Sequence, residues 1–569
     1  MNDTLSSIDT RRPRRGLSHV KGLTDVELLD VTIPELLAAT AKRHPDRLAA
    51  VFCDRAVRWT WAEFADKAEK LAIEFARIGL RKGDRVGMWG PNSPEWILTQ
   101  FATARLGAIL VSINPAYRLD ELEFALSKTQ CKAIVIAEEF KSSNYVAMIQ
   151  RLVPELAAAT NTKWTPVKLP CLEFVIKAGR TPVAGMINFD DIAQHEVAAC
   201  SQSLNHFTAL APHDPINIQF TSGTTGSPKG ATLTHRNVVN NGRFTVSAMA
   251  LSPADTLCIP VPLYHCFGMV MGVLGCVSCG AAMVFPGEGF DPSTTLRSVA
   301  NERCTAVYGV PSMFSAMLNL PNFAEYNLSS LRTGIMAGAP CPSVLMERVI
   351  EEMHMSEVTI CYGMTETSPV SFQSATDDPV ERRVATIGRV HPHVEVKIVD
   401  EAGATVPTGI AGEICCRGYS VMQGYWDDEE RTKNVIRDGW MHTGDIGVID
   451  DAGYASIGGR LKDMVIRGGE NIYPREIEDF LLKNTKFREV QVFGVPDAHF
   501  GEQLCAWIVC RDGQSATEDD VVAFCKDRIS HYKIPKYIRF RDALPMTATG
   551  KPQKFKMREE MILELGLKV

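Results

Sequence analysis

The sequence predicts an α/β fold built from more than one domain. Segments with helical spacing of apolar residues alternate with short apolar runs from about Ile33 onward, which is typical of layered α/β structures. The chain has 569 residues, whereas a single hydrophobic core stops growing at about 250–300 residues. After about Thr386 the pattern changes to short strands with many turns, and it changes again near Gly458. We therefore expect layered α/β subdomains with a small β-rich subdomain, followed by a small α+β domain.

These changes in pattern give the expected domain boundaries. Residues 1–32 form an N-terminal arm, residues 33–460 the large domain with its β-rich part from about residue 386, and residues 461–569 the small domain. The arm contains four arginines, which we interpret as solvated: Arg11, Arg12, Arg14 and Arg15. No apolar core follows them, so a secretory signal is not indicated.

The first elements of the large domain predict a βαβ unit. Trp96–Leu106 has apolar residues at helical spacing, and Ala108–Ile113 resembles a strand. Arg85–Trp89 and Ala133–Ile136 are short apolar runs between amphipathic stretches, so both are expected to be strands. The crossover between parallel strands should be right-handed.

Four later strands should carry polar loops at their carboxyl ends, since Gly, Pro, Ser or Thr follows each within two residues. They are Ile216–Phe220, Ala281–Phe285, Ala306–Tyr308 and Val358–Cys361. Ligands of open α/β sheets bind beyond the carboxyl ends of the strands, so a site is expected there. The remaining expected elements are a strand at Val394–Val399, a helix from Pro474, strands near Glu489–Val495 and Ala506–Val509, and a helix at about Glu518–Ile529.

Composition is typical of a globular enzyme and excludes several classes. Hydrophobic residues make up 45% and charged residues 22%, as in folded domains. The net charge of -7 gives no basic field for nucleic acid. The 16 cysteines are scattered, and the one CxxC pair, Cys276 and Cys279, lies in an apolar stretch, so we interpret them as reduced core thiols. No run reaches the 18 apolar residues of a membrane span, and we expect a cytoplasmic protein.

The segment Thr-Ser-Gly-Thr-Thr-Gly-Ser-Pro-Lys-Gly at Thr221–Gly230 is the strongest functional signal. It directly follows a predicted strand, where hydroxyl and backbone N–H groups would converge on an anion. The spacing is not that of a Walker A loop, because Gly226 is followed by Ser-Pro before Lys229. A flexible Ser/Gly linker is the alternative, but a linker seldom follows a strand directly.

This segment resembles the signature loop of the adenylate-forming superfamily, which includes acyl-CoA synthetases, luciferases and adenylation domains of peptide synthetases. The resemblance runs from about Ile33 to the C-terminus. It implies a mobile flap over the β- and γ-phosphates of ATP. The implied ATP-binding residues are Thr221, Ser222, Gly223, Thr224, Thr225, Gly226 and Lys229, with Thr221 also catalytic.

Further motifs match the same superfamily in order. Tyr362, Gly363 and Thr365 belong to a Tyr-Gly-x-Thr-Glu motif that implies adenine stacking and phosphate binding, and Glu366 of that motif would bind Mg²⁺ through a hard carboxylate oxygen. A capped helix start is the alternative for this motif. Asp445 resembles the aspartate that holds the ribose hydroxyls, and Arg460 the arginine that assists it; a turn aspartate and a surface arginine are the alternatives.

The C-terminal motifs imply a domain that moves between two half-reactions. Lys462 lies where the superfamily has its hinge, and Arg467, Gly468 and Gly469 resemble the segment that lines the pantetheine tunnel, with a plain glycine turn as the alternative. Lys551 matches the lysine on a mobile loop that reaches the carboxylate and the α-phosphate. Such a cation offsets the repulsion between two anions, although Lys551 alone would be taken for a surface lysine in a basic tail.

The segments that resemble the acid pocket are apolar. They are Pro262–Gly268, Val307–Pro311 and Ala337–Pro340. The candidate residues of the acid pocket are His265, Phe267, Gly268, Val310, Gly338 and Met364. Gly338, Ala339 and Pro340 are also expected to contact the nucleotide. These segments contain no Arg or Lys for a second carboxylate, and no aspartate stands near His265 for an amino group, so an amino acid substrate is not expected. His265 is either catalytic, orienting the carboxylate, or a packed polar residue.

The resemblance therefore implies an ATP-dependent acyl-CoA ligase that uses ATP, Mg²⁺ and coenzyme A. Tyr362–Ser371 and Lys462–Glu476 look most like the medium-chain fatty acyl-CoA synthetase branch. Aromatic or short branched acids remain open, because one methylene discriminates by only about 1–3 kcal/mol. An acyl-AMP ligase that loads a carrier protein and a catalytically silent binding protein are the rival functions. Neither nucleic acid nor a transmembrane segment is expected, and a homodimer is left open.

Overall fold

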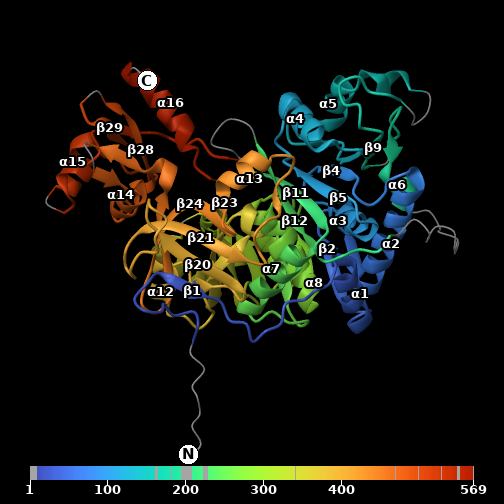
Figure 1. Ribbon diagram of the computed structural model, residues 1–569, viewed down its shortest axis with the longest axis horizontal. Coiled ribbons are helices and arrows are strands. Elements are labelled where there is room, and N and C mark those ends of the chain that lie inside the picture. Colours follow the sequence, from blue (N-terminus) through green and yellow to red (C-terminus); the bar gives the residue numbers. More distant parts are fainter. Residues whose placement is uncertain are drawn as a thin grey trace, which may run out of the picture. The chain divides into compact units, whose positions relative to one another are not determined.

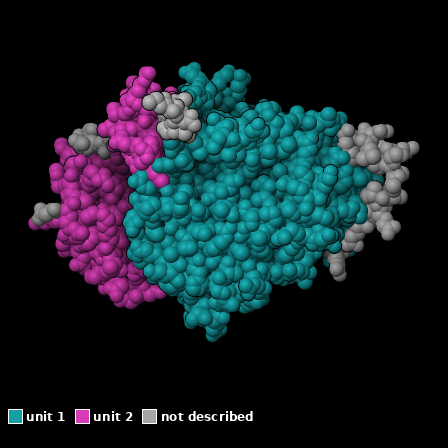
Figure 2. All heavy atoms as spheres, turned by 90° about the horizontal axis from the view of Figure 1, so that it is seen from below, with its two compact units in different colours: residues 1–11, 21–395, 416–441 teal, residues 12–20, 396–415, 442–569 magenta. Residues whose placement is uncertain are grey.

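The computed structural model describes residues 9–159, 164–179, 181–193, 208–221, 228–339, 341–467, 470–497, 499–526, 528–547 and 551–567 (Figure 1). The chain forms two compact units, which Figure 2 shows in different colours. Unit 1 comprises residues 1–11, 21–395 and 416–441, and unit 2 comprises residues 12–20, 396–415 and 442–569. The domain boundary expected after Arg460 lies within unit 2 and stays a prediction.

An eight-stranded sheet forms one layer of unit 1. Its order is β10 (Ile187–Asn188), β9 (Phe174–Lys177), β6 (Ala133–Ile136), β4 (Arg85–Trp89), β5 (Ile109–Ile113), β11 (Pro215–Thr221), β12 (Lys229–Thr234) and β22 (Gly424–Tyr425). The strands are parallel from β10 to β11, whereas β12 and β22 are antiparallel to their neighbours. Its helices include α2 (Trp61–Ile78), α3 (Pro94–Leu106), α4 (Leu119–Thr129), α5 (Tyr145–Leu152) and α6 (Phe189–Ala193).

A nine-stranded sheet forms the second layer. Its order is β19 (Arg389–Val390), β18 (Val370–Gln373), β17 (Glu357–Gly363), β16 (Thr333–Ala337), β15 (Ala306–Gly309), β13 (Thr256–Cys258), β14 (Ala282–Phe285), β2 (Leu48–Phe52) and β3 (Val57–Thr60). The strands from β17 to β2 are parallel. The helices of this part are α1 (Ile33–Arg43), α7 (His235–Ala248), the π-helix η3 (Phe267–Leu274), α8 (Gly275–Cys279), α9 (Pro292–Asn301), α10 (Pro311–Leu318), α11 (Ser343–Glu352) and α12 (Val380–Ala385).

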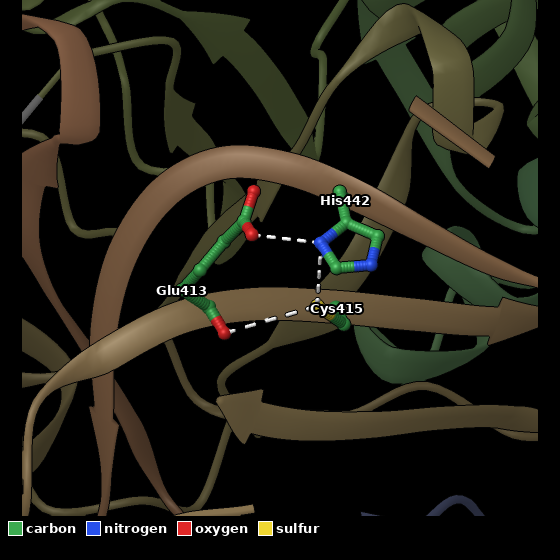
Figure 3. A group of neighbouring side chains, drawn as sticks. All are labelled: Glu413, Cys415 and His442. Carbon is green, nitrogen blue, oxygen red and sulfur yellow. Dashed lines mark hydrogen bonds and ion pairs between the residues drawn. The ribbon is translucent and has the colours of Figure 1, made fainter. Parts of the chain in front are cut away.

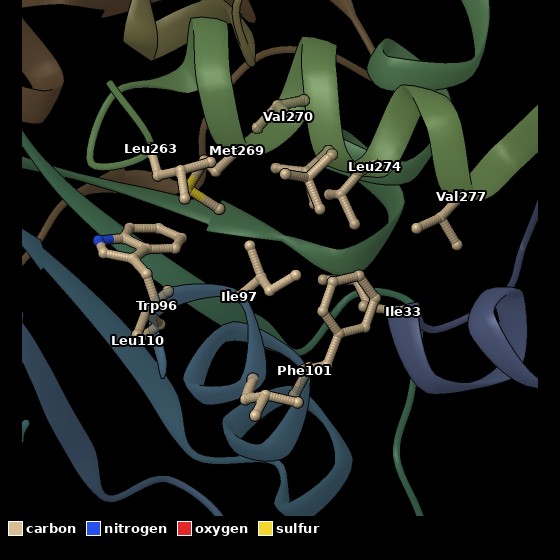
Figure 4. Close-up of a cluster of buried hydrophobic side chains, with 14 of the residues drawn as sticks. Ile33, Trp96, Ile97, Phe101, Leu110, Leu263, Met269, Val270, Leu274 and Val277 are labelled. Atoms are coloured by element: carbon tan, nitrogen blue, oxygen red, sulfur yellow. The ribbon is translucent and has the colours of Figure 1, made fainter. Parts of the chain in front are cut away.

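Helices between the two sheets build the largest core of unit 1. Figure 4 shows Trp96, Ile97 and Phe101 of α3 facing Met269 and Leu274 of the π-helix. Nearly every residue of α3 is buried, so its sequence is apolar all round rather than on one face. The helix begins where the Ser93 hydroxyl accepts a hydrogen bond from the Trp96 amide, and it ends at a left-handed Gly107. Each large side chain buried here contributes about 1.5–3 kcal/mol.

A six-stranded sheet contains the N-terminal strand. Its order is β1 (His19–Lys21), β20 (Val394–Val399), β21 (Gly412–Gly418), β24 (Trp440–Ile449) and β23 (Ile436–Arg437), and β25 (Ala455–Arg460) pairs with β24. The Ser18 amide donates to the Val406 carbonyl over 2.8 Å, so the last part of the N-terminal arm pairs with the sheet, whereas Arg12, Arg14 and Arg15 are exposed as expected. A buried backbone N–H group must find a partner, and here that partner lies far along the chain.

A five-stranded sheet completes unit 2 and confirms the expected α+β character of the C-terminal part. Its order is β27 (Glu470–Ile472), β26 (Val465–Arg467), β29 (Gly501–Cys510) and β28 (Phe487–Asp497), and β30 (Tyr537–Phe540) pairs with β29. The helices are α14 (Pro474–Leu481), α15 (Glu518–Cys525) and α16 (Lys554–Leu565). The helix expected to reach Ile529 ends at Cys525, four residues earlier.

The described cysteines form no disulfide, and most of them are buried. Cys276 and Cys279 both lie in α8, where burial raises the pKa of the Cys279 thiol to about 11. Both residues pack against the large core, as expected. In the described part of the chain, no helix is long and apolar enough to cross a membrane.

Buried His391 predicts a loss of stability in acid. Burial lowers its pKa from 6.5 to about 3, and its Nε2 lies 2.9 Å from the Gln373 Oε1. The unfolded chain binds a proton below pH 6.5 that the folded protein rejects, so stability is full above that pH and falls as pH drops toward 3. At pH 5 the loss is about 2 kcal/mol from this residue. Urea unfolding of His391→Gln between pH 7 and 5 should show a flatter pH dependence, whereas the exposed His213→Gln should match the parent. An unchanged slope in His391→Gln would contradict this origin.

Candidate active site

The glycine-rich segment lies between two paired strands of unit 1. Strand β11 ends at Thr221, β12 begins at Lys229, and these two residues are opposite one another in the antiparallel register. The sequence therefore places the segment as the connection of a β-hairpin whose ends are fixed by the sheet. Several candidate residues lie outside the described residues: Ser222, Gly223, Thr224, Thr225, Gly226, Pro340, Gly468 and Gly469.

Glu366 lies at the centre of the described contacts in unit 1. It belongs to a short 3₁₀-helix, Thr365–Thr367, that follows β17, and only 5% of the residue is exposed. Its Oε1 accepts hydrogen bonds from the Tyr425 hydroxyl at 2.9 Å and from the Thr221 hydroxyl at 3.4 Å. The structure therefore brings the end of β11, the Tyr-Gly-x-Thr-Glu motif and β22 to one carboxylate.

Tyr425 was not identified from the sequence. Burial and the adjacent Glu366 carboxylate raise the pKa of Tyr425, so its hydroxyl stays protonated and donates to Glu366. The ammonium of Lys229 lies 5.1 Å from the centre of the Tyr425 ring, within the range of a cation–π contact. Two hydroxyls thus meet at one carboxylate, and an ammonium lies over the ring of one of them, where the glycine-rich segment begins and ends.

The backbone holds the Tyr-Gly-x-Thr-Glu motif tightly. A Cβ added to Gly363 would lie 1.7 Å from the Pro369 carbonyl oxygen, so only glycine fits between these chains. The Asn241 side chain donates to the Val370 carbonyl at 2.8 Å and accepts from the Val370 amide at 3.0 Å. Tyr362 is half-buried beside Phe372, with ring centres 6.4 Å apart.

The apolar segments converge near the carboxyl ends of β15 and β16. The Phe267 ring lies 5.2 Å from the Tyr308 ring, and a Cβ on Gly338 would lie 3.2 Å from Val310. Half-buried His265 accepts a hydrogen bond at Nδ1 from the Phe267 amide at 3.2 Å, which fixes its ring beside these segments. Gly268 is required because a Cβ there would lie 2.4 Å from the Pro262 carbonyl oxygen. Ala339 and Met364 are both half-buried.

Cys266 lies beneath this region and is not a nucleophile. Its thiol donates to Gln219 Oε1 over 3.0 Å, and no part of the residue is exposed. Burial raises the pKa of Cys266, and the negative charge of Glu366 raises it further. The reactive thiolate form is therefore suppressed at neutral pH.

Unit 2 holds Asp445 and Arg460 as a cross-strand pair. These residues are opposite one another in the β24–β25 register, and Arg460 Nε lies 3.3 Å from Asp445 Oδ1. The turn before Asp445 is held by Glu413, whose Oε1 accepts from the Gly444 amide at 3.0 Å and whose Oε2 lies 2.7 Å from His442 Nδ1. These contacts fix the backbone that presents the Asp445 carboxylate.

The remaining candidates also lie in unit 2. Lys462 belongs to a 3₁₀-turn after β25. Arg467 donates through Nε to Gln503 over 2.7 Å, and its guanidinium lies 4.5 Å from the centre of the Phe500 ring. The Lys551 amide donates to the Thr547 hydroxyl at 3.0 Å, and the Thr547 amide donates back to the Lys551 carbonyl at 2.7 Å. Thr547 and Lys551 are thus linked by two hydrogen bonds, while the roles of these candidate side chains stay predictions.

Comparison with known proteins defines the class. Residues 37–426 match the AMP-binding enzyme family, and residues 476–551 match the AMP-binding enzyme C-terminal domain. The first match covers more than half of the chain. The chain belongs to the AMP-binding enzyme family, which confirms the resemblance seen in its motifs.

Individual relatives are similar over nearly their whole length. The chain is 48% identical to YngI of Bacillus subtilis (strain 168), which is named as an acyl-CoA synthetase; the match covers 94% of this chain and 98% of YngI. It is 46% identical to the mitochondrial medium-chain acyl-CoA ligase ACSF2 of Danio rerio, and the match covers 98% of this chain and 92% of that relative. Among solved structures, the anthranilate CoA ligase AuaEII in complex with anthranoyl-AMP has a TM-score of 0.82 at 26% identity. The match covers 95% of this chain and 99% of AuaEII. The expected fold class is confirmed.

Proposed function

We propose that the protein activates medium-chain fatty acids. It is an ATP-dependent acyl-CoA ligase, which converts a carboxylic acid, ATP and coenzyme A into acyl-CoA, AMP and diphosphate through an acyl-AMP. The observation that best supports a phosphate-handling role for the site is that the Thr221 and Tyr425 hydroxyls both donate to Glu366, while the Lys229 ammonium lies over the Tyr425 ring. Hydroxyl and ammonium groups suit an anion, and the carboxylate suits a hard cation.

In the first half-reaction, residues of both units would bind ATP and the acid. The Glu366 carboxylate fits Mg²⁺, because both of its described side-chain hydrogen bonds fall on Oε1 and leave Oε2 for a cation. When bound there, Mg²⁺ would neutralise phosphate charge. Lys229 and Thr221 would contact phosphates, Tyr362 would stack on adenine, and Asp445 with Arg460 would hold the ribose. Lys551 would balance the charge between carboxylate and α-phosphate.

In the second half-reaction, Lys462 would act as the hinge and Arg467 would contact coenzyme A. The five-stranded sheet supports a small domain that begins near Leu461, because among the described residues its strands pair with one another and its buried side chains run from Val465 to Met561. Such a self-contained core can move as a body when a few hinge residues change conformation.

The medium-chain assignment rests on the relatives and on the apolar segments near His265. ACSF2 of Danio rerio, by its name, acts on medium-chain acids, and Phe267, Val310 and Tyr308 offer no second charge to a substrate. Aryl and short branched acids are the alternatives, and AuaEII shows that a related fold accepts an aromatic acid. A cytoplasmic location and a homodimer stay predictions, since the ACSF2 relatives are named mitochondrial.

Diphosphate release with Mg²⁺, ATP and coenzyme A tests this proposal. Linear fatty acids of graded length should show an optimum at medium length that depends on coenzyme A, with benzoate, cinnamate and short branched acids as comparisons. Release only with aromatic or branched acids would contradict the chain-length assignment. Release that is independent of coenzyme A, with acyl-AMP as the product, would favour a ligase that loads a carrier protein.

A further inference from the structure

A carboxylate, a thiol and an imidazole of unit 2, from Glu413, Cys415 and His442, lie close together (Figure 3). Glu413 and Cys415 lie on β21, and alternate residues of a strand point to the same face. His442 lies on the neighbouring strand β24. One donor atom of each residue lies within 4.8 Å of the donors of the other two. His442 Nδ1 is 2.7 Å from Glu413 Oε2 and 3.4 Å from Cys415 Sγ.

We propose that Glu413, Cys415 and His442 form a binding site for a zinc ion. Zinc is bound in proteins by thiolate, imidazole and carboxylate, usually with four ligands in a tetrahedron. At ordinary bond lengths the ligand atoms of such a tetrahedron lie about 3.3–3.6 Å apart. The 3.4 Å distance between His442 Nδ1 and Cys415 Sγ already fits this range. The 2.7 Å distance between His442 Nδ1 and Glu413 Oε2 is too short, and a small rotation of the Glu413 carboxylate would lengthen it. Three protein ligands leave the fourth position for water or a small anion.

The surroundings favour zinc over magnesium and give it access. A thiol and an imidazole are soft or borderline ligands, whereas Mg²⁺ prefers oxygen ligands only. The side chains of His442 and Glu413 keep 15% and 19% of their surface exposed, while Cys415 is fully buried behind them. Zinc would displace the proton shared by His442 Nδ1 and Glu413 Oε2 and the thiol proton of Cys415, and both protons would pass to solvent.

Zinc at this position would act on ATP binding, a consequence that rests on the proposed role of Asp445. Glu413 Oε1 accepts the Gly444 amide at 3.0 Å, and Thr443 donates to the Ile414 carbonyl at 2.8 Å. The same carboxylate would therefore serve both the ion and the turn that presents Asp445. Rotation of Glu413 toward zinc would weaken its bond to Gly444 and raise the KM for ATP.

Binding is measured directly on the full chain, after treatment with a chelator and without ATP. Zinc is titrated against a chromophoric zinc indicator in the parent, in Cys415→Ser and in Cys416→Ser. Cys416 is the matched control, because it is also fully buried on β21 but points to the opposite face, with its Sγ 3.8 Å from the Ser371 hydroxyl. The parent and Cys416→Ser should bind one zinc with equal affinity, and Cys415→Ser should bind at least about tenfold more weakly.

Cobalt gives a second readout that does not depend on a stable serine variant. Co²⁺ added to the parent should produce a thiolate-to-cobalt absorption band, and His442→Gln should shift or weaken this band while Cys416→Ser keeps it. Equal zinc affinity in Cys415→Ser and Cys416→Ser, or cobalt binding without a thiolate band, would overturn the proposal.

The functional consequence is tested separately. Zinc should raise the KM for ATP in the parent and in Cys416→Ser, and leave the KM of Cys415→Ser at its zinc-free value. If zinc binds through Cys415 but the KM for ATP is unchanged, the metal site stands and the proposed role of Asp445 is contradicted.

Discussion

Lys551→Ala is expected to lose acyl-AMP formation while it keeps the transfer of the acyl group from supplied acyl-AMP to coenzyme A. Carboxylate and α-phosphate are both anionic, so removing the ammonium should slow adenylation by about 10²–10³-fold. Diphosphate exchange reports the first step, and acyl-CoA formation from synthetic acyl-AMP reports the second.

Lys556→Ala is the matched control for this prediction. Lys556 lies on the same stretch of chain and is exposed, and the one described contact of its side chain is with the face of Phe555, whose centre is 6.0 Å from the ammonium. It should leave both steps unchanged. Lys554 is unsuitable, because it forms a 2.6 Å ion pair with buried Glu478 and its loss would destabilise the fold. An equal loss of both steps in Lys551→Ala would contradict the division of labour.

Glu366→Gln should reduce adenylation by about 100-fold or more, because an amide oxygen binds Mg²⁺ far less strongly than a carboxylate does. The variant keeps an acceptor for the Tyr425 hydroxyl, so the packing around residue 366 should survive. Activity measured against Mg²⁺ concentration should show a higher half-saturation in the variant.

Tyr425→Phe separates the role of the charge from that of the hydrogen bond. It removes only the hydroxyl that donates to Glu366 and keeps the ring beside Lys229. Its loss of activity should be much smaller than that of Glu366→Gln, with unchanged Mg²⁺ dependence. A Mg²⁺ half-saturation that is the same in Glu366→Gln and the parent would show that this carboxylate does not hold the metal.

Local patterns predicted the strands and the order of the motifs well. Arg85–Trp89 and Ala133–Ile136 are strands β4 and β6 with the expected ends, since an apolar run between polar turns marks where a strand begins and ends. The helix expected from Trp96 begins at Pro94, because Ser93 and Pro94 supply a cap that apolar spacing does not reveal.

Contacts between distant segments could not be predicted in this way. Tyr425 reaches Glu366, 59 residues away, only because β22 pairs with β12. His442 meets Glu413 because β21 and β24 are neighbours, although 29 residues separate them. The π-helix at Phe267–Leu274 could not be predicted, because an apolar stretch fits several helical geometries. Pairing of strands is decided by the whole sheet, and no single segment carries that information.

The position of β1 in the six-stranded sheet affects how the protein folds during its synthesis. The hydroxyl of Ser18 donates to the Pro407 carbonyl, and 389 residues separate the two. A ribosome adds about 5–20 residues per second, so this strand waits about 20–80 s for its partner. A strand without a partner can associate with other nascent chains, but β1 has only three residues and follows exposed Arg12, Arg14 and Arg15. The shortness of β1 and the positive charge just before it both disfavour such association while the ribosome completes the chain.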